Sequence, residues 1–154
     1  MARVIFWLVI LITTVIQAQS SSEADVKLAV DTFFEGFHKG DTLLMKSVMM
    51  DKFTTQTAFK NKEGKDVLVT EESSKIIKAI GSRPADQKWD ERLLDYNIQV
   101  DGNMANVWTP YEFWFNGEFS HCGVNSFQLF NDNGQWKIIY IIDTRRRTSC
   151  YDKN

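Results

Sequence analysis

A carboxylate, an imidazole and several indole rings occur close together in a segment typical of a β-hairpin. Asn116-Gly117 is a characteristic two-residue hairpin turn. A tight turn there pairs Phe115 with Glu118 and, counting outward, places Glu112 opposite His121. Such a carboxylate can hold an imidazole in one tautomer and raise its pKa, as a general base requires. A cross-strand ion pair between two buried polar groups explains the same residues, and we favour this structural role over catalysis.

The alternation of side chains along two hairpins predicts which residues share a face with His121. We expect this face to be the interior, because it collects large aromatic rings and the few groups that could do chemistry. The candidate catalytic residues are His121 and Glu112, and the candidate ligand-binding residues are Trp108, Glu112, Trp114, His121, Asn125, Tyr140 and Arg146. The aromatic members could stack on a flat ligand or simply form the core, and both interpretations stay open.

Other polar residues are given structural roles. Arg145–Arg147 could bind an anion, but consecutive like charges usually face water, so a solvated strand end is favoured. His38 lies near the end of a predicted helix, where a cation suits the helix dipole. No metal site is expected, because the chain has two histidines and the neighbours His121 and Cys122 point to opposite faces of a strand. No phosphate-binding or hydrolase motif occurs, and no cofactor is expected.

Helical periodicity predicts the elements of the first half of the chain. A long amphipathic helix runs from about residue 20 to Gly40, with an apolar face that repeats at helical spacing. A second, shorter helix follows Gly40-Asp41 and ends near Met50. Residues 53–60 are predicted to form a short strand, and a third helix is expected between Thr70 and Gly81.

The period changes from helical to alternating after Trp89. Turn signals at residues 101–103, 116–117 and 133–134 predict four long strands near residues 88–100, 104–115, 118–131 and 135–146. Strands this long must twist and curl. The predicted fold is α+β, a cone-shaped curved antiparallel sheet of four long strands plus a short one, wrapped around the long N-terminal helix and two shorter helices.

The N-terminus has the pattern of a secretory signal peptide. Arg3 precedes an uncharged stretch at residues 4–16 that ends at Gln17-Ala18-Gln19, and this stretch is shorter than the ~20 residues that a membrane span needs. We therefore expect a cleaved signal at residues 1–18, a single domain at residues 19–154, and a secreted or periplasmic protein without a membrane partner.

The charge of the chain limits its classes of partner, and its two cysteines raise the question of a disulfide. The chain has 18 basic and 20 acidic residues with no long basic run, which argues against a nucleic-acid partner. Cys122 and Cys150 form an even count in an oxidising compartment. One disulfide and two buried free thiols are both compatible with their spacing.

Three segments carry a resemblance to a known family. They are FFEGFHKGD at residues 33–41, YEFWFNGEFSHCGVNSFQLF at residues 111–130 and GQWKIIYIIDTRRR at residues 134–147. Together they resemble the nuclear transport factor 2-like (NTF2-like) superfamily, and within it the exported lumazine-binding group with a SnoaL-like cone fold. The resemblance implies a dimer through the sheet and a pocket between the long helix and the concave sheet face. No catalytic set of related enzymes matches residue by residue, so no catalytic role is transferred.

Three functions follow as hypotheses. We prefer an exported protein that binds a small apolar or aromatic molecule non-covalently. The second is a lyase, isomerase or hydratase in which His121 moves a proton and Glu112 orients it. The third is a scaffolding module that acts through an apolar outer sheet face, which a homodimer would cover. That outer face is predicted to include Tyr111, Phe113, Val124, Ile139 and Ile141.

Overall fold

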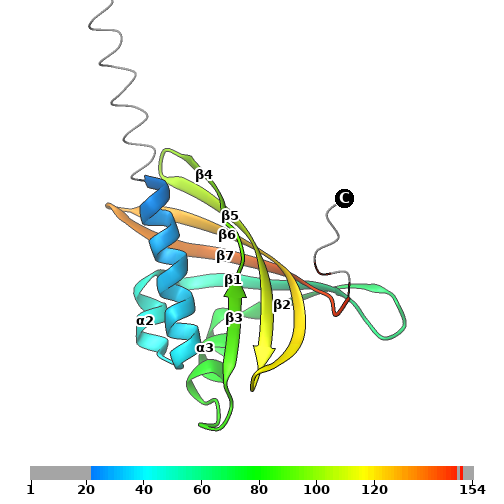
Figure 1. Cartoon of the computed structure of the whole chain (residues 1–154). Helices are drawn as coiled ribbons and strands as arrows, with labels where there is room; N and C mark the ends of the chain where they lie inside the picture. Colours follow the sequence, from blue (N-terminus) through cyan, green and yellow to red (C-terminus); the bar gives the residue numbers. More distant parts are fainter. Residues whose placement is uncertain (1–21, 149, 151–154) are drawn as a thin grey trace, which may run out of the picture.

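The computed structural model describes residues 22–148 and 150. Its elements are an N-terminal helix at residues 22–39, α2 (Thr42–Ser47), β1 (Met49–Lys60), β2 (Asp66–Glu72), α3 (Ser73–Gly81), β3 (Trp89–Leu93), β4 (Asn97–Asp101), β5 (Met104–Phe115), β6 (Glu118–Asp132) and β7 (Gln135–Arg145). Figure 1 shows one curved sheet with the N-terminal helix lying across its concave face. The predicted α+β class with a long first helix and two shorter helices is confirmed.

The sheet is larger and more mixed than the alternating pattern predicts. Its seven strands have the order β2-β1-β7-β6-β5-β3, with β4 also paired to β5. β1 runs parallel to β7, whereas the other pairs are antiparallel. The predicted strand at residues 88–100 is divided into β3 and β4. The predicted start of the third helix at Thr70 is wrong, because residues 66–72 pair with β1 as β2 before α3 begins.

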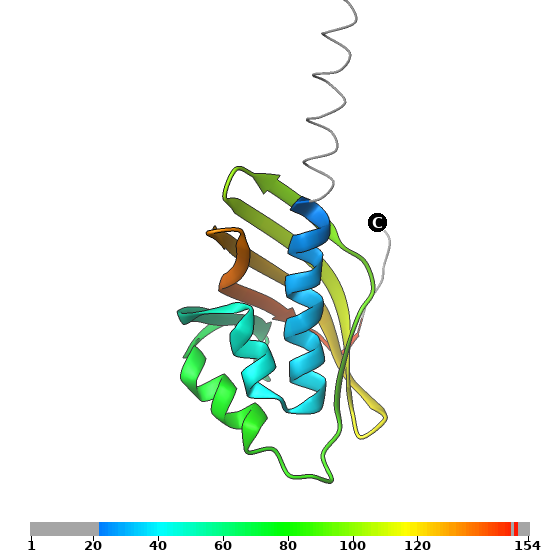
Figure 2. The same cartoon turned by 90° about the vertical axis from the view of Figure 1, so that its left-hand side faces the viewer.

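The N-terminal helix supplies one side of the core. Its buried face includes Phe33 and Phe34, whose rings lie 6.0 and 5.9 Å from the ring of Phe127 on β6. The helix ends at Gly40, which adopts a positive φ of 72°. The Asp41 side chain then accepts hydrogen bonds from the first turn of α2. Figure 2 shows α2 and α3 beside the lower end of the long helix, on the same side of the sheet.

The hairpin turns form where the sequence predicts them. Asn116 and Gly117 have φ values of 52° and 85°, and Asn133 and Gly134 have values of 53° and 89°, as type I′ turns require. The β5–β6 ladder begins in the expected register, with Phe115 opposite Glu118.

A β-bulge then changes the register. Trp114 pairs with Phe119, but Phe113 pairs with His121, so β6 contains one extra residue, Ser120. Glu112 is consequently opposite Cys122. The predicted Glu112–His121 pair is wrong: a shift of one residue reverses which face each later side chain occupies.

A second irregularity lies between β6 and β7. Gln128 pairs with Tyr140 while Leu129 pairs with Ile138, which leaves Ile139 as the extra residue. Beyond it, Ile141 and Asp143 are buried on the concave side. The expected inward direction of Tyr140 is therefore wrong, and this side chain alternates to the convex side.

These two shifts also correct the predicted outer face. Tyr111 and Ile141 are buried, with exposed fractions of 1% and 9%, and Phe113 stacks with His121 on the concave side. Ile139 lies at the convex surface as predicted, with 38% of its area exposed.

The two cysteines form a disulfide. The Cys122 and Cys150 Cα atoms are 5.7 Å apart, and the bond ties the segment after β7 to the middle of β6. Cys122 and Arg146 also exchange two backbone hydrogen bonds of 2.9 Å. The predicted signal peptide at residues 1–18 lies outside the described residues. None of the described helices has both the length and the apolar character needed to span a membrane.

Candidate functional site

Four of the predicted ligand-binding residues lie on the convex face of the sheet. Trp108 is half exposed. Trp114 donates from Nε1 to the carboxylate of Glu112 at 3.0 Å. The Tyr140 hydroxyl bonds to Gln56 at the same convex surface. These four side chains lie away from the side that the N-terminal helix covers.

The remaining predicted residues lie in or near a groove at one end of the sheet. The groove has a volume of about 1290 Å³ and is formed by β1, β2, the loop between them, His121 of β6 and the end of β7. His121 and Arg146 line it, and Asn125 is buried on the concave face behind His121. Its walls combine apolar and basic side chains, which include Ala58, Phe59, Val67, Val69, Lys60, Lys62, Arg145 and Arg147.

A buried carboxylate supports this groove from below. Asp143 is 8% exposed and accepts hydrogen bonds from Thr57 Oγ1 at 2.6 Å and from Arg145 Nε at 2.7 Å. The hydroxyl of Tyr111 donates to the same carboxylate at 3.0 Å. Three donors from β1, β5 and β7 therefore converge on one anionic side chain, and a buried charge held in this way is well compensated.

A second carboxyl group lies deeper on the concave face. Asn125 Nδ2 donates to Glu91 Oε1 at 2.7 Å. Burial raises the pKa of Glu91 to about 7, and the nearby Asp143 carboxylate adds to this rise, while the bond from Asn125 opposes it. Burial also raises the pKa of Tyr111, so its phenol remains a hydrogen-bond donor. The pair Glu91 and Asn125 can therefore hold or release a proton near neutral pH.

His121 is held as a neutral imidazole. Its ring lies 5.0 Å from the ring of Phe113, and its Nδ1 is 3.1 Å from the hydroxyl of Ser120, the extra residue of the bulge. Burial, together with the positive charge of Arg145, lowers the pKa of His121 to about 4. His121 thus offers the groove a hydrogen-bonding ring without a positive charge at neutral pH.

The other histidine has a structural role, but not as the cation at the helix end that the sequence predicts. His38 Nε2 lies 3.0 Å from the backbone nitrogen and 2.9 Å from the backbone oxygen of Glu91. Burial lowers the pKa of His38, which favours the neutral ring. The ring therefore fastens β3, and with it Glu91, to the N-terminal helix.

The close approach of β6 to β7 below the groove depends on Gly123. A Cβ atom at Gly123 would lie 1.7 Å from the backbone oxygen of Thr144 and 2.9 Å from Cε1 of Tyr111. Only a residue without a side chain lets β6 approach β7 and Tyr111 this closely.

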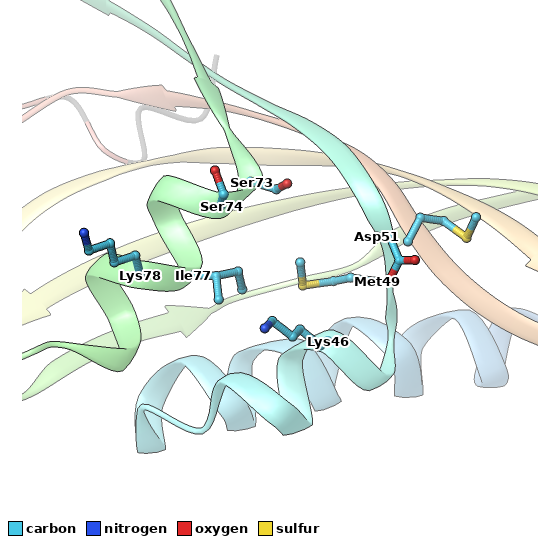
Figure 3. Close-up of a pocket in the computed structure, with 8 residues that line it drawn as sticks. Lys46, Met49, Asp51, Ser73, Ser74, Ile77 and Lys78 are labelled. Atoms are coloured by element: carbon cyan, nitrogen blue, oxygen red, sulfur yellow. The ribbon is translucent and has the colours of Figure 1, made fainter.

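A smaller hollow of about 400 Å³ lies between α2, α3 and β1. Figure 3 shows Lys46, Met49 and Ile77 facing this space, whereas the amine of Lys78 points away from it. Lys46, Ser74 and Lys78 are exposed side chains, and Asp51 places a negative charge at the same rim. Among residues 22–148 and 150, no three His, Cys, Asp or Glu side chains are grouped as a metal site requires.

Sequence reasoning missed the residues that organise the groove. The alternation that places Ile139 and Ile141 on the outer face also predicts Asp143 and Arg145 there, and Glu91 and Thr57 are not among the predicted site residues. One signal was available, because Glu91 alternates with Trp89 and Leu93 on the concave side of β3. A charged residue at the apolar positions of a strand indicates a buried polar contact.

No protein-family model matches the sequence, and no curated protein matches it. Solved structures do match the fold. An NTF2-like protein of unknown function from Shewanella baltica has a TM-score of 0.63 and 13% identity, and the match covers 84% of this chain and 97% of that one. This chain has the NTF2-like fold.

Two further structures with the NTF2-like fold show the same level of similarity. An NTF2-like superfamily protein from Salmonella enterica has a TM-score of 0.65 and 17% identity, covering 88% of this chain and 98% of that one. A proposed dehydratase of the NTF2-like family from Streptomyces avermitilis has a TM-score of 0.63 and 14% identity, covering 82% and 97%. The fold is shared at identities that carry no information about the ligand.

Proposed function

We propose that this chain is an exported protein that binds a small apolar or aromatic molecule non-covalently in the groove formed by β1, β2, β6 and β7. The observation that carries this proposal is the groove itself, whose volume of about 1290 Å³ suits a small molecule and whose apolar walls adjoin fixed polar groups. Asp143 and its three donors keep the floor of the groove rigid, so a ligand meets preformed contacts.

Export is supported by two features. The signal-like pattern of residues 1–18 is one, and the Cys122–Cys150 disulfide is the other, since such bonds persist mainly in oxidising compartments. The proposal is therefore a periplasmic or secreted binding protein.

Native mass spectrometry of protein purified from its host tests the binding function. We expect a retained small molecule in the wild type, loss of that mass in Val69→Trp, which fills the groove, and retention in Ser74→Trp, which fills the smaller hollow. The neutral probe naphthalene-2-methanol, followed by NMR shifts of groove residues, gives a second readout. A wild type without retained mass and without groove shifts from this probe contradicts the proposal.

A lyase or isomerase reaction is a second candidate, and Glu91 is the specific observation in its favour. A carboxyl group with a pKa of about 7 can give or accept a proton at neutral pH. Glu112 has no part in this reaction, because it lies on the opposite face from His121. In a screen of small hydroxy and keto compounds, turnover that Glu91→Gln abolishes supports the second candidate, and turnover that Glu91→Gln leaves unchanged removes it.

A homodimer through the convex sheet face is proposed as the quaternary state. Met104, Trp108 and Ile139 there are 54%, 50% and 38% exposed, which is an unusual concentration of apolar surface for a monomer. Light scattering after gel filtration tests this, with a dimer expected for the wild type and a monomer for Ile139→Glu. A monomeric wild type contradicts it.

A further inference from the structure

We propose that the ligand of the groove is a small organic acid, and that Arg145 recognises its carboxylate through both terminal nitrogens of the guanidinium group. This proposal rests on the proposed binding function and adds the chemical class of the ligand.

The orientation of Arg145 is fixed before any ligand arrives. Its Nε donates to Asp143 Oδ2 at 2.7 Å, and Asp143 is itself held by Thr57 and Tyr111. The guanidinium group is planar, so fixing Nε fixes the plane in which both Nη atoms lie. An arginine anchored in this way loses little side-chain freedom when it binds an anion.

The two Nη groups of Arg145 remain available for binding. The only hydrogen-bonded partner of its side chain among residues 22–148 and 150 is Asp143, through Nε, while half of the side chain is exposed in the groove wall. Two parallel N–H groups match the spacing of the two oxygens of a carboxylate, and such bidentate pairs are among the strongest hydrogen-bonded contacts in proteins.

The charge around Arg145 also favours an anion. Lys62, Arg146 and Arg147 line the same groove, and Arg146 also donates from Nη2 to the backbone oxygen of Cys150 at 3.1 Å. Lys60 is paired with Asp66 at 2.6 Å. Glu71 is the other acidic side chain of the groove lining. The lining thus has an excess of positive charge, which attracts a negatively charged ligand.

The remaining walls define the rest of the ligand. Phe59, Val67 and Val69 supply apolar area beside the charged rim. An inorganic anion would leave this area in contact with water, whereas an acid with an aliphatic or aromatic body covers it. A carboxylate on an apolar body is therefore the chemistry that both parts of the groove fit.

Isothermal titration calorimetry with two probes of the same shape tests the proposal. The probes are naphthalene-2-carboxylate and its neutral counterpart naphthalene-2-methanol, with the wild type and with Arg145→Gln, Arg145→Lys, Arg147→Gln and Lys78→Gln. We expect the carboxylate to bind the wild type about tenfold more tightly than the alcohol, because a charge-assisted bidentate contact is added. Arg145→Gln should remove this difference, and Arg145→Lys should restore only part of it.

The controls separate this contact from general attraction to basic surface. Arg147→Gln, which removes an equal charge from the same groove, should change carboxylate affinity less than about threefold, and Lys78→Gln should not change it. Equal losses in Arg145→Gln and Arg147→Gln, or equal binding of the two probes by the wild type, overturn the proposal while the binding function stands. Failure of both probes to bind the wild type overturns this proposal, and the binding function falls with it when the wild type also retains no small molecule in native mass spectrometry.

Discussion

The groove at the end of β7 and the hollow beside α3 both contain lysines and apolar side chains, but they differ in what lies behind them. The polar groups of the hollow, Lys46, Ser74 and Lys78, extend from exposed positions. In the groove, Arg145 rests on Asp143, which is 8% exposed and tied to three strands. The comparison teaches that fixed buried partners, more than the presence of charge, distinguish a preformed site from a surface depression.

The largest expected difference between the two regions is the loss of stability when a nearby glycine is replaced by alanine. Gly123→Ala places a Cβ 1.7 Å from the Thr144 backbone oxygen, so β6 and β7 must separate, and we expect a loss of about 4 kcal/mol in the free energy of unfolding. In Gly81→Ala the new Cβ meets only the side chain of Thr42, whose methyl group is at 3.0 Å, and we expect a change in stability of less than about 1 kcal/mol. Urea denaturation of both variants measures this, and similar losses in both would contradict the contrast.

Removal of the disulfide should have the next largest effect. Cys150→Ser opens a link between residues 28 positions apart, which is worth about 3 kcal/mol through the entropy of the unfolded chain. NMR shift changes should be concentrated at Arg145 to Thr148 and absent at Lys46 and Lys78. Reductant should lower the stability of the wild type and leave Cys150→Ser unchanged; a wild type insensitive to reductant counts against this role.

Neutralising the Asp143 carboxylate under the groove should lower the free energy of unfolding by less than removal of the disulfide does. Asp143→Asn keeps the shape but turns one acceptor into a donor that faces Thr57, Tyr111 or Arg145, and we expect a loss of about 2 kcal/mol. Asp51→Asn at the rim of the hollow is the matched control and should stay within about 0.5 kcal/mol. Thermal unfolding monitored by circular dichroism measures both, and an Asp51 effect as large as that of Asp143 would remove the distinction.

The smallest expected effect is the pH dependence of stability, in which two groups of the wild type oppose each other. The pKa of Glu91 rises from 4.5 to about 7 on folding, so the folded state binds more protons and stability falls as pH increases through that interval. The pKa of His121 falls from 6.5 to about 4, so stability rises with pH between 4 and 6.5. The two slopes oppose each other between pH 4.5 and 6.5.

Single substitutions should expose each slope. Glu91→Gln keeps an acceptor for Asn125 and removes the opposing slope of Glu91. The stability of this variant should therefore increase by about 2 kcal/mol from pH 4 to 6.5, because of His121 and, in part, of His38, whose pKa is also lowered. His121→Asn should lose about as much from pH 4.5 to 7. Denaturation curves at several pH values give the slopes, and a slope of the same sign in both variants would show that these groups do not control the profile.

The accuracy of the sequence predictions depends on how local the controlling interactions are. The long helix and its end at Gly40 follow from apolar spacing and a glycine with positive φ, which involve only neighbouring residues. The turns at Asn116-Gly117 and Asn133-Gly134 are equally local. The parallel pairing of β1 with β7 joins residues far apart in the chain, so no short pattern could predict it.

The site predictions failed for a related reason. His121 and Asn125 were placed correctly on the concave face, but Glu112 and Tyr140 were assigned to it from an uninterrupted alternation. Ser120 and Ile139, the extra residues at the two register shifts, have no distinguishing type in the sequence. Beyond each extra residue, side chains that simple alternation assigns to the concave face lie on the convex face, and the reverse.

Local sequence patterns specify the helix, the turns and the alternating strands, because each depends on residues that are near one another along the chain. Tertiary structure alone decided which carboxylate meets which base, since β6 and β7 accept an extra residue where the curved sheet bends over the core. Those two insertions move Glu112 to the convex face, bring Arg145 into the groove and place Asp143 beneath it.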